Sequence, residues 1–158
     1  MKSVLTCVVA ISGILLNAQT SKPQPEKSFA QQVVEEMLAA HPELVGLELA
    51  STPPGKKQCV IIASNEAKQI GAKCDKDEFT AMRTDKPFVE KEKEGGTEIY
   101  DVTVAIHDSQ GKTIATAGID FKPEPGQQEV HVTQSAQQIA KEIEEKIKTK
   151  ERLFSPAR

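Results

Sequence analysis

Histidine is the residue type in this chain best suited to catalysis or metal binding, and its three copies are far apart. His41, His107 and His131 lie at an expected helix end, strand end and loop, with no two at the spacing of metal ligands. The sequence also contains no nucleophile elbow, no HExxH pair, no phosphate-binding glycine loop and no CxxCH motif. We therefore predict surface histidines, no metal or other cofactor, and no enzymatic activity. The alternative is a three-histidine metal site assembled by the fold.

Cysteine chemistry depends on the compartment, and the N-terminus indicates export. Lys2 precedes an apolar run from Val4 to Leu16, and the small residue Ala18 closes it, which is the order that a signal peptidase reads. The run has about 13 residues, whereas a bilayer-spanning helix needs about 20. We predict a signal peptide at 1–18, no stable membrane span, and a periplasmic or secreted product.

Two cysteines, Cys59 and Cys74, follow the signal segment. Exported proteins keep disulfides, so these two residues form a candidate bridge. A loop of about 15 residues closed in this way gains about 3 kcal/mol in the chain-entropy account. The alternative is two unpaired thiols, one of them buried in a strand.

The overall charge excludes one class of partner. The chain has 20 basic and 23 acidic residues, a formal net charge of −3 and 4% aromatic residues. Nucleic-acid binding uses a basic stripe that neutralises phosphates, and no such stripe is present. We expect no nucleic-acid partner. The length after the signal segment fits one domain.

The hydrophobic pattern predicts one α+β domain at 28–149, after a disordered, proline-containing lead-in at 19–27. Ser28 begins a first helix that ends before His41-Pro42. Strands are expected at 45–51, 58–63, 87–93, 97–108 and 112–121, mostly antiparallel, with a short helix at 75–83.

A final amphipathic helix is expected from Thr133, because its apolar residues fall on one face while the other face is charged. The segment 150–158 is predicted to be a flexible tail. The predicted fold is therefore an N-terminal helix packed on a five-stranded, PAS-like, mostly antiparallel sheet, followed by a C-terminal amphipathic helix.

Three stretches together resemble the extracytoplasmic PAS-like sensor domains called Cache or PDC domains. The first is Val60-Ile61-Ile62-Ala63-Ser64-Asn65, leading to Ile70-Gly71, and the second is the helix-to-strand passage from Phe79 to Pro87. The third, Tyr100 to Phe121, contains the turn Asp108-Ser109-Gln110-Gly111 and the strand end Gly118-Ile119-Asp120. The resemblance covers about half of the chain.

This resemblance implies a ligand pocket on the sheet face opposite the long helix, beside the loops that follow the second strand. In amino-acid-binding relatives the aspartate that matches Asp120 pairs with the ligand ammonium group. Arg83 is a candidate clamp for a carboxylate, and Tyr100 is a candidate pocket wall. The alternatives are a solvent-facing aspartate, a surface arginine, and a core tyrosine packed beside Val102 and Val104.

The function expected from this resemblance is that of an exported, soluble, stand-alone sensor-like domain without catalytic activity. Its partners would be a small metabolite, such as an amino acid or a carboxylate, and a membrane receptor that relays the signal. The alternative is an extracytoplasmic protein-interaction module with no ligand pocket.

Overall fold

The computed structural model describes residues 27–94 and 96–157, so the predicted signal peptide and almost all of the lead-in lie outside the described residues. The elements follow one another as α1 (Phe29–Ala40), β1 (Leu44–Ser51), β2 (Val60–Ser64), α2 (Lys76–Thr84), β3 (Phe88–Glu94), β4 (Thr97–His107), β5 (Thr113–Phe121), α3 (Glu129–Ile147) and α4 (Lys150–Leu153). The predicted α+β class is confirmed.

The strands form one five-stranded sheet in the order β2-β1-β5-β4-β3, and every neighbouring pair is antiparallel. The long hairpin β4–β5 lies at its centre and turns through Asp108 to Gly111. There the Asp108 carboxylate accepts hydrogen bonds from the backbone N–H of Gln110 and of Lys112, as expected for an Asx-type turn.

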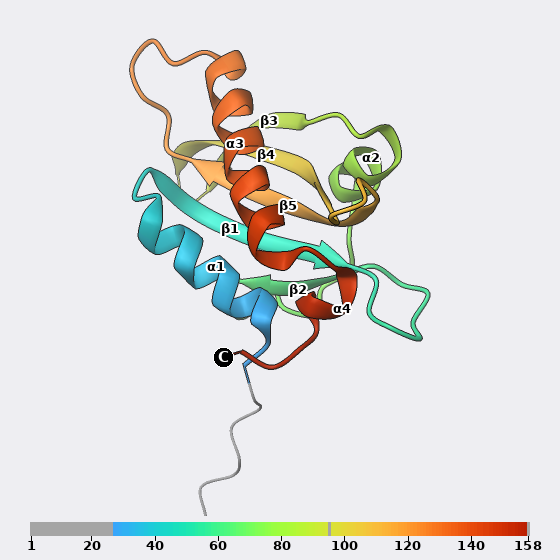
Figure 1. The fold of residues 1–158 in the computed structure, drawn as a ribbon. Helices are drawn as coiled ribbons and strands as arrows, with labels where there is room; N and C mark the ends of the chain where they lie inside the picture. The colour runs from blue at the N-terminus through green and yellow to red at the C-terminus, as the bar shows by residue number, and fades with distance from the viewer. Residues whose placement is uncertain (1–26, 95, 158) are drawn as a thin grey trace, which may run out of the picture.

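Helices α1 and α3 cover one face of this sheet (Figure 1). Side chains alternate across a strand, so β4 sends Tyr100, Val102, Val104 and Ile106 to this face. They join the apolar stripe of α3, which includes Ile139, Ile143 and Ile147, in the main hydrophobic core. The helix face therefore carries the main hydrophobic core.

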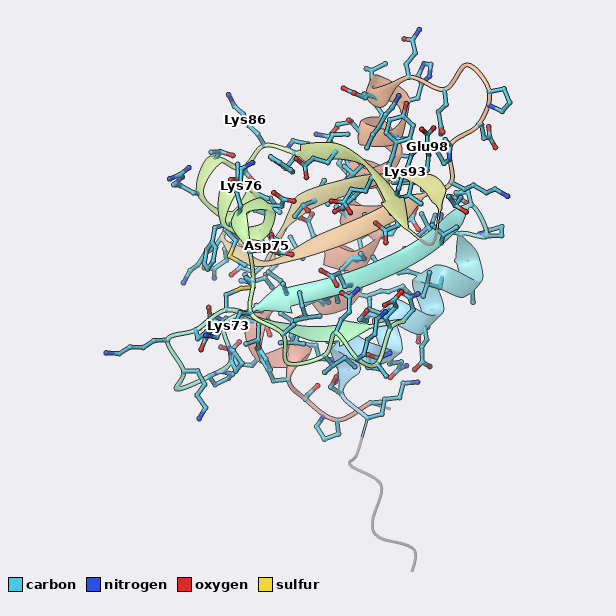
Figure 2. All side chains as sticks on the ribbon, turned by 180° about the vertical axis from the view of Figure 1, so that it is seen from behind. Lys73, Asp75, Lys76, Lys86, Lys93 and Glu98 are labelled. Carbon is cyan, nitrogen blue, oxygen red and sulfur yellow. A yellow bond between two sulfur atoms is a disulfide. The ribbon has the colours of Figure 1, made fainter. Side chains whose placement is uncertain are left out.

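The opposite face is only partly covered. Helix α2 lies over one end of it, against β4 and β5 (Figures 1 and 2). A disulfide joins Cys59 to Cys74 beside this helix. The candidate bridge is therefore present, and the two cysteines are not unpaired thiols. A second, smaller core forms there around Ala50 and Ile61.

The segment after α3 corrects the predicted flexible tail. Leu153 of α4 is fully buried in the main core. The backbone N–H of Phe29 donates to the carbonyl of Ser155 at 2.7 Å, and the Arg152 guanidinium lies 3.6 Å from the centre of the Phe29 ring. The tail prediction is wrong for residues 150–157, because one buried leucine and these contacts fix the segment against the start of α1.

None of the helices within the described ranges combines the length and the apolar character needed to cross a membrane.

Candidate ligand-binding site

The open face of the sheet contains a pocket of about 270 Å³. Strands β1, β5 and β4 form its floor, and α2, β3 and the segment after β2 form its walls. Its lining consists of Glu48, Gln69, Asp75, Asp77, Glu78, Glu92, Lys93, Ile99, Asp101, Thr103, Gly118 and Asp120. Figure 2 views this face, with Asp75 at one end and Lys93 at the other.

Strand register brings the floor carboxylates together. Asp101 of β4 is directly opposite Asp120 of β5, and Asp120 is opposite Gly46 of β1. One step along the sheet, Glu48 is opposite Gly118. These side chains share one face because positions two apart on a strand, or directly opposite on neighbouring strands, point the same way.

Two glycines make room for these carboxylates. A Cβ atom added at Gly46 would overlap the Asp120 carboxylate, and one added at Gly118 would lie 3.1 Å from Cγ of Glu48. Each acidic side chain therefore lies across the backbone of the strand beside it. This pattern of a glycine opposite an acidic residue occurs twice between β1 and β5.

Helix α2 brings Glu78 to the pocket. Asp75 caps the helix by accepting a hydrogen bond from the N–H of Asp77, and Glu78 accepts one from the N–H of Asp75 at 2.8 Å. This capping box fixes the first turn, and the disulfide holds the residue immediately before it. Glu78 is buried, and its carboxyl group lies close enough to Glu48 to raise the pKa of Glu48.

Crowding of acidic groups changes how they titrate. Burial, together with the nearby carboxylates of Glu78, Asp101 and Asp120, raises the pKa of Glu48 to about 8. Burial and the charge of Asp120 raise the pKa of Asp101 to about 7. Burial also raises the pKa of Glu78. Near neutral pH the pocket therefore holds protons that would dissociate from carboxyl groups in water.

The pocket is suited to a positively charged ligand. Its lining has seven carboxyl groups and one cationic side chain, Lys93. Perturbed acidic groups that converge in a concave site are a common feature of binding and catalytic sites. Among the described residues, no group of three His, Cys, Asp or Glu side chains has an arrangement that could hold a metal ion.

The three residues predicted from the sequence are not brought together. Asp120 lines the pocket. Arg83 lies on the exposed side of α2, in a separate groove. Tyr100 points into the helix-side core, where it is 3% exposed and its hydroxyl donates to the carbonyl of Gln127 at 3.3 Å. Arg83 is therefore a surface arginine and Tyr100 a core tyrosine, which were the alternatives to their roles in the pocket.

Sequence reasoning missed Glu48, Glu78 and Asp101. The available signal was weak: Glu48 and Asp101 each lie between apolar residues in a strand, which is also the pattern of an ordinary solvent-facing position. The glycines opposite Glu48 and Asp120 were a further signal, but they acquire a meaning only once the strand order is known.

Two of the histidines connect secondary-structure elements. His107, at the end of β4, contacts Glu144 of α3 through Nδ1 and Asp85 through Nε2, both at 2.7 Å. His41, after α1, contacts Glu142 of α3 at 2.9 Å. They lie in ion-pair networks, so they contribute to helix packing.

Comparison with known proteins gives a similarity of fold. No family model matches the chain, and no curated protein sequence matches it. Among solved structures it resembles the repressor BlcR of Agobacterium tumefaciens, with 13% identity and a TM-score of 0.55, over 75% of this chain and 67% of BlcR.

Two sensor-related structures are more distant. The DcuS sensor domain of E. coli has 14% identity and a TM-score of 0.46, over 71% of this chain and 74% of that one. The periplasmic domain of RsbU from Chlamydia trachomatis has 15% identity and a TM-score of 0.45, over 62% and 36%. Of these three comparisons, the one with BlcR exceeds a TM-score of 0.5, and at 13% identity it shows a similarity of fold alone.

Proposed function

We propose that this chain contains a Cache-like sensor domain, exported to the periplasm or beyond, that binds a small molecule without catalysis. The observation that supports this function most directly is the carboxylate-lined pocket of about 270 Å³ on the open sheet face. A pocket there matches the position that the family resemblance implies. It favours ligand binding over an interaction module with no pocket.

The ligand we propose is a small organic molecule with a positively charged nitrogen. An ammonium group donates three hydrogen bonds and would be attracted to Asp120, Asp101 and Glu48. This extends the role expected for Asp120 to two further carboxyl groups. An amino acid would satisfy the proposal through its ammonium end.

A ligand with only carboxylate groups does not fit this pocket. Arg83, the expected clamp, lies in another groove, and Lys93 is the one cation in the lining. Placing a further negative charge beside seven acidic groups would cost free energy through repulsion. Of the two ligand classes expected from the sequence, the amino acid is retained and the simple carboxylate is not.

Thermal-shift screening and calorimetry test this function. Putrescine, arginine and succinate would be compared as a diamine, a cationic amino acid and a dicarboxylate. We expect the first two to raise the melting temperature, because a ligand at about 100 times its Kd stabilises the folded state by about 2.7 kcal/mol. Succinate should have no such effect.

Proton release gives an independent readout. A bound cation favours the ionised forms of Glu48 and Asp101, so binding near pH 7 should release protons and the affinity should increase as the pH rises towards about 8. Calorimetry in buffers of different ionisation enthalpy measures this release.

Asp120→Asn and Glu48→Gln should each weaken amine binding by about tenfold or more, as expected for loss of a charge-assisted hydrogen bond. Glu98→Gln, which removes a carboxylate of β4 that does not line the pocket, is the matched control. Stabilisation by succinate alone, or binding that is the same in all three variants, would refute the proposed site.

A further inference from the structure

The outer face of α2 carries a stripe of two cations around an aromatic ring. Lys76, Phe79 and Arg83 are three and four residues apart, which places them on one side of the helix. Phe79 is 54% exposed. They line a shallow groove of about 520 Å³ together with Thr80 and Met82. We call Lys76, Phe79 and Arg83 the outer stripe.

Lys76 of the outer stripe contacts the Phe88 ring of β3, but the main attachment of α2 to the fold lies elsewhere. The helix is attached through its inner side, where Glu78 and Ala81 are buried. The capping box at Asp75 and the disulfide at Cys74 fix its start. Burying a phenylalanine side chain stabilises a protein by about 1.5–3 kcal/mol relative to leaving it exposed. The exposed ring of Phe79 does not contribute this free energy to the fold. Its position therefore indicates a contact outside this domain.

The cations of the stripe are available to such a contact. The Lys76 ammonium lies over the Phe88 ring, 5.0 Å from its centre, which fixes its position without neutralising it. Within the described ranges, the Arg83 guanidinium forms no ion pair or hydrogen bond. Figure 2 shows Lys86, just beyond the helix, pointing away from the fold.

We propose that the outer stripe docks an acidic segment of a partner protein. An apolar side chain of the segment would pack on Phe79, while its carboxylates pair with Lys76 and Arg83. An exposed aromatic ring with arginine beside it is typical of the residues that dominate binding energy at protein interfaces. Charge complementarity therefore selects an acidic partner.

The surroundings of the stripe favour a narrow partner over an anionic membrane. Asp75 and Asp77 lie in or next to the first turn of α2, and Asp85 follows its last turn. An extended anionic surface would bring its charges against these carboxylates as well as against the cations. A peptide segment in the groove would contact the groove lining, which contains no carboxylate. The proposal does not depend on what binds in the pocket.

Nuclear magnetic resonance of the isotope-labelled protein tests the docking. The probes are a peptide of alternating glutamate and leucine, its glutamine–leucine counterpart, and vesicles of phosphatidylcholine with phosphatidylserine. We expect the acidic peptide to shift amide signals from Lys76 to Lys86, with an affinity at least about tenfold above that of the glutamine peptide.

Charge reversal and truncation complete the test. Lys76→Glu combined with Arg83→Glu, and separately Phe79→Ala, should each weaken binding of the acidic peptide by about tenfold or more. The matched controls on α3 are Lys141→Glu and Val130→Ala, which also change exposed residues and should leave binding unchanged. Unaltered melting temperatures confirm that the stripe variants fold.

Three results would overturn the proposal. They are an absence of peptide-induced shifts in α2, equal affinity for the acidic and glutamine peptides, or binding to the anionic vesicles without binding to the peptide. The last would identify a membrane-binding surface instead.

Discussion

Asp101 and Asp120 lie directly opposite each other on the two central strands of the hairpin β4–β5, with both side chains on the open face. Like charges at opposed positions destabilise a sheet. Burial and the charge of Asp120 raise the pKa of Asp101 to about 7, so the pair carries less than its full charge near neutrality. The sheet tolerates the pair partly by retaining a proton.

This relationship predicts that stability decreases as the pH rises. The native pKa values of Glu48 and Asp101, about 8 and about 7, lie above the ordinary values of 4.5 and 3.8. The folded state therefore binds more protons than the unfolded state between these limits. The resulting stability is complete below about pH 4 and is lost as the pH rises through about 7 and 8. Denaturant unfolding across this range measures the decrease.

Replacing Asp120 with Asn should reduce that decrease. Removing one charge of the opposed pair is expected to raise the free energy of unfolding at about pH 8 by about 0.5–1 kcal/mol and to lower the native pKa of Asp101. Little change is expected near pH 4, where Asp101, with a native pKa of about 7, is protonated and places no charge opposite Asp120. The same loss of stability between pH 4 and 8 in the variant and the parent would contradict this account.

The contacts of His107 with Glu144 and Asp85 predict a second stabilising interaction that is lost as the pH rises. Burial of the ring lowers its pKa, but hydrogen bonds to Glu144 and Asp85 outweigh this and raise it. The stabilisation is therefore complete below about pH 6.5, the unfolded value, and is lost as the pH rises through the native pKa. His107→Gln should cost about 1 kcal/mol at about pH 5.5 and less at about pH 8.5. An equal cost at both pH values would show that the charge on the ring contributes nothing.

The Cys59–Cys74 bridge predicts a redox-dependent stability. Replacing both cysteines with serine should lower the free energy of unfolding by about 3 kcal/mol, since the bridge closes a loop with a sequence separation of 15 residues. A reductant should destabilise the parent by a similar amount and leave the double variant unaffected. Sensitivity of the double variant to reductant would show that another effect is responsible.

Leu153, in the segment after α3, is expected to contribute to the stability of the main hydrophobic core. Leu153→Ala should destabilise the protein by about 2–5 kcal/mol, because this side chain is fully buried. Val130→Ala, at a position that is 51% exposed, should change stability by less than about 0.5 kcal/mol. Chemical denaturation of both variants makes the comparison, and equal effects would contradict the proposed role of Leu153.

Local patterns predicted the five strands and the three longer helices, but not the short helix α4. The alternation of Tyr100, Val102 and Val104 with more polar residues predicted a strand with one buried face, and the structure confirms both the strand and the face. The apolar stripe of the final helix predicted its packing in the same way. These features depend on residues close together in the chain, where the periods of helix and strand constrain the pattern directly.

The pocket and the C-terminal contact depended on the tertiary structure. Glu48, Asp101 and Asp120 are far apart in the sequence, and only the order β1-β5-β4 makes them neighbours. Leu153 and Phe154 are two adjacent apolar residues after three charged ones, and no periodicity predicts that Leu153 is buried. The sequence alone determined the five strands, helices α1, α2 and α3, and the apolar faces of β4 and α3. Only packing decided which faces meet, because burial and charge proximity arise between residues that are distant along the chain.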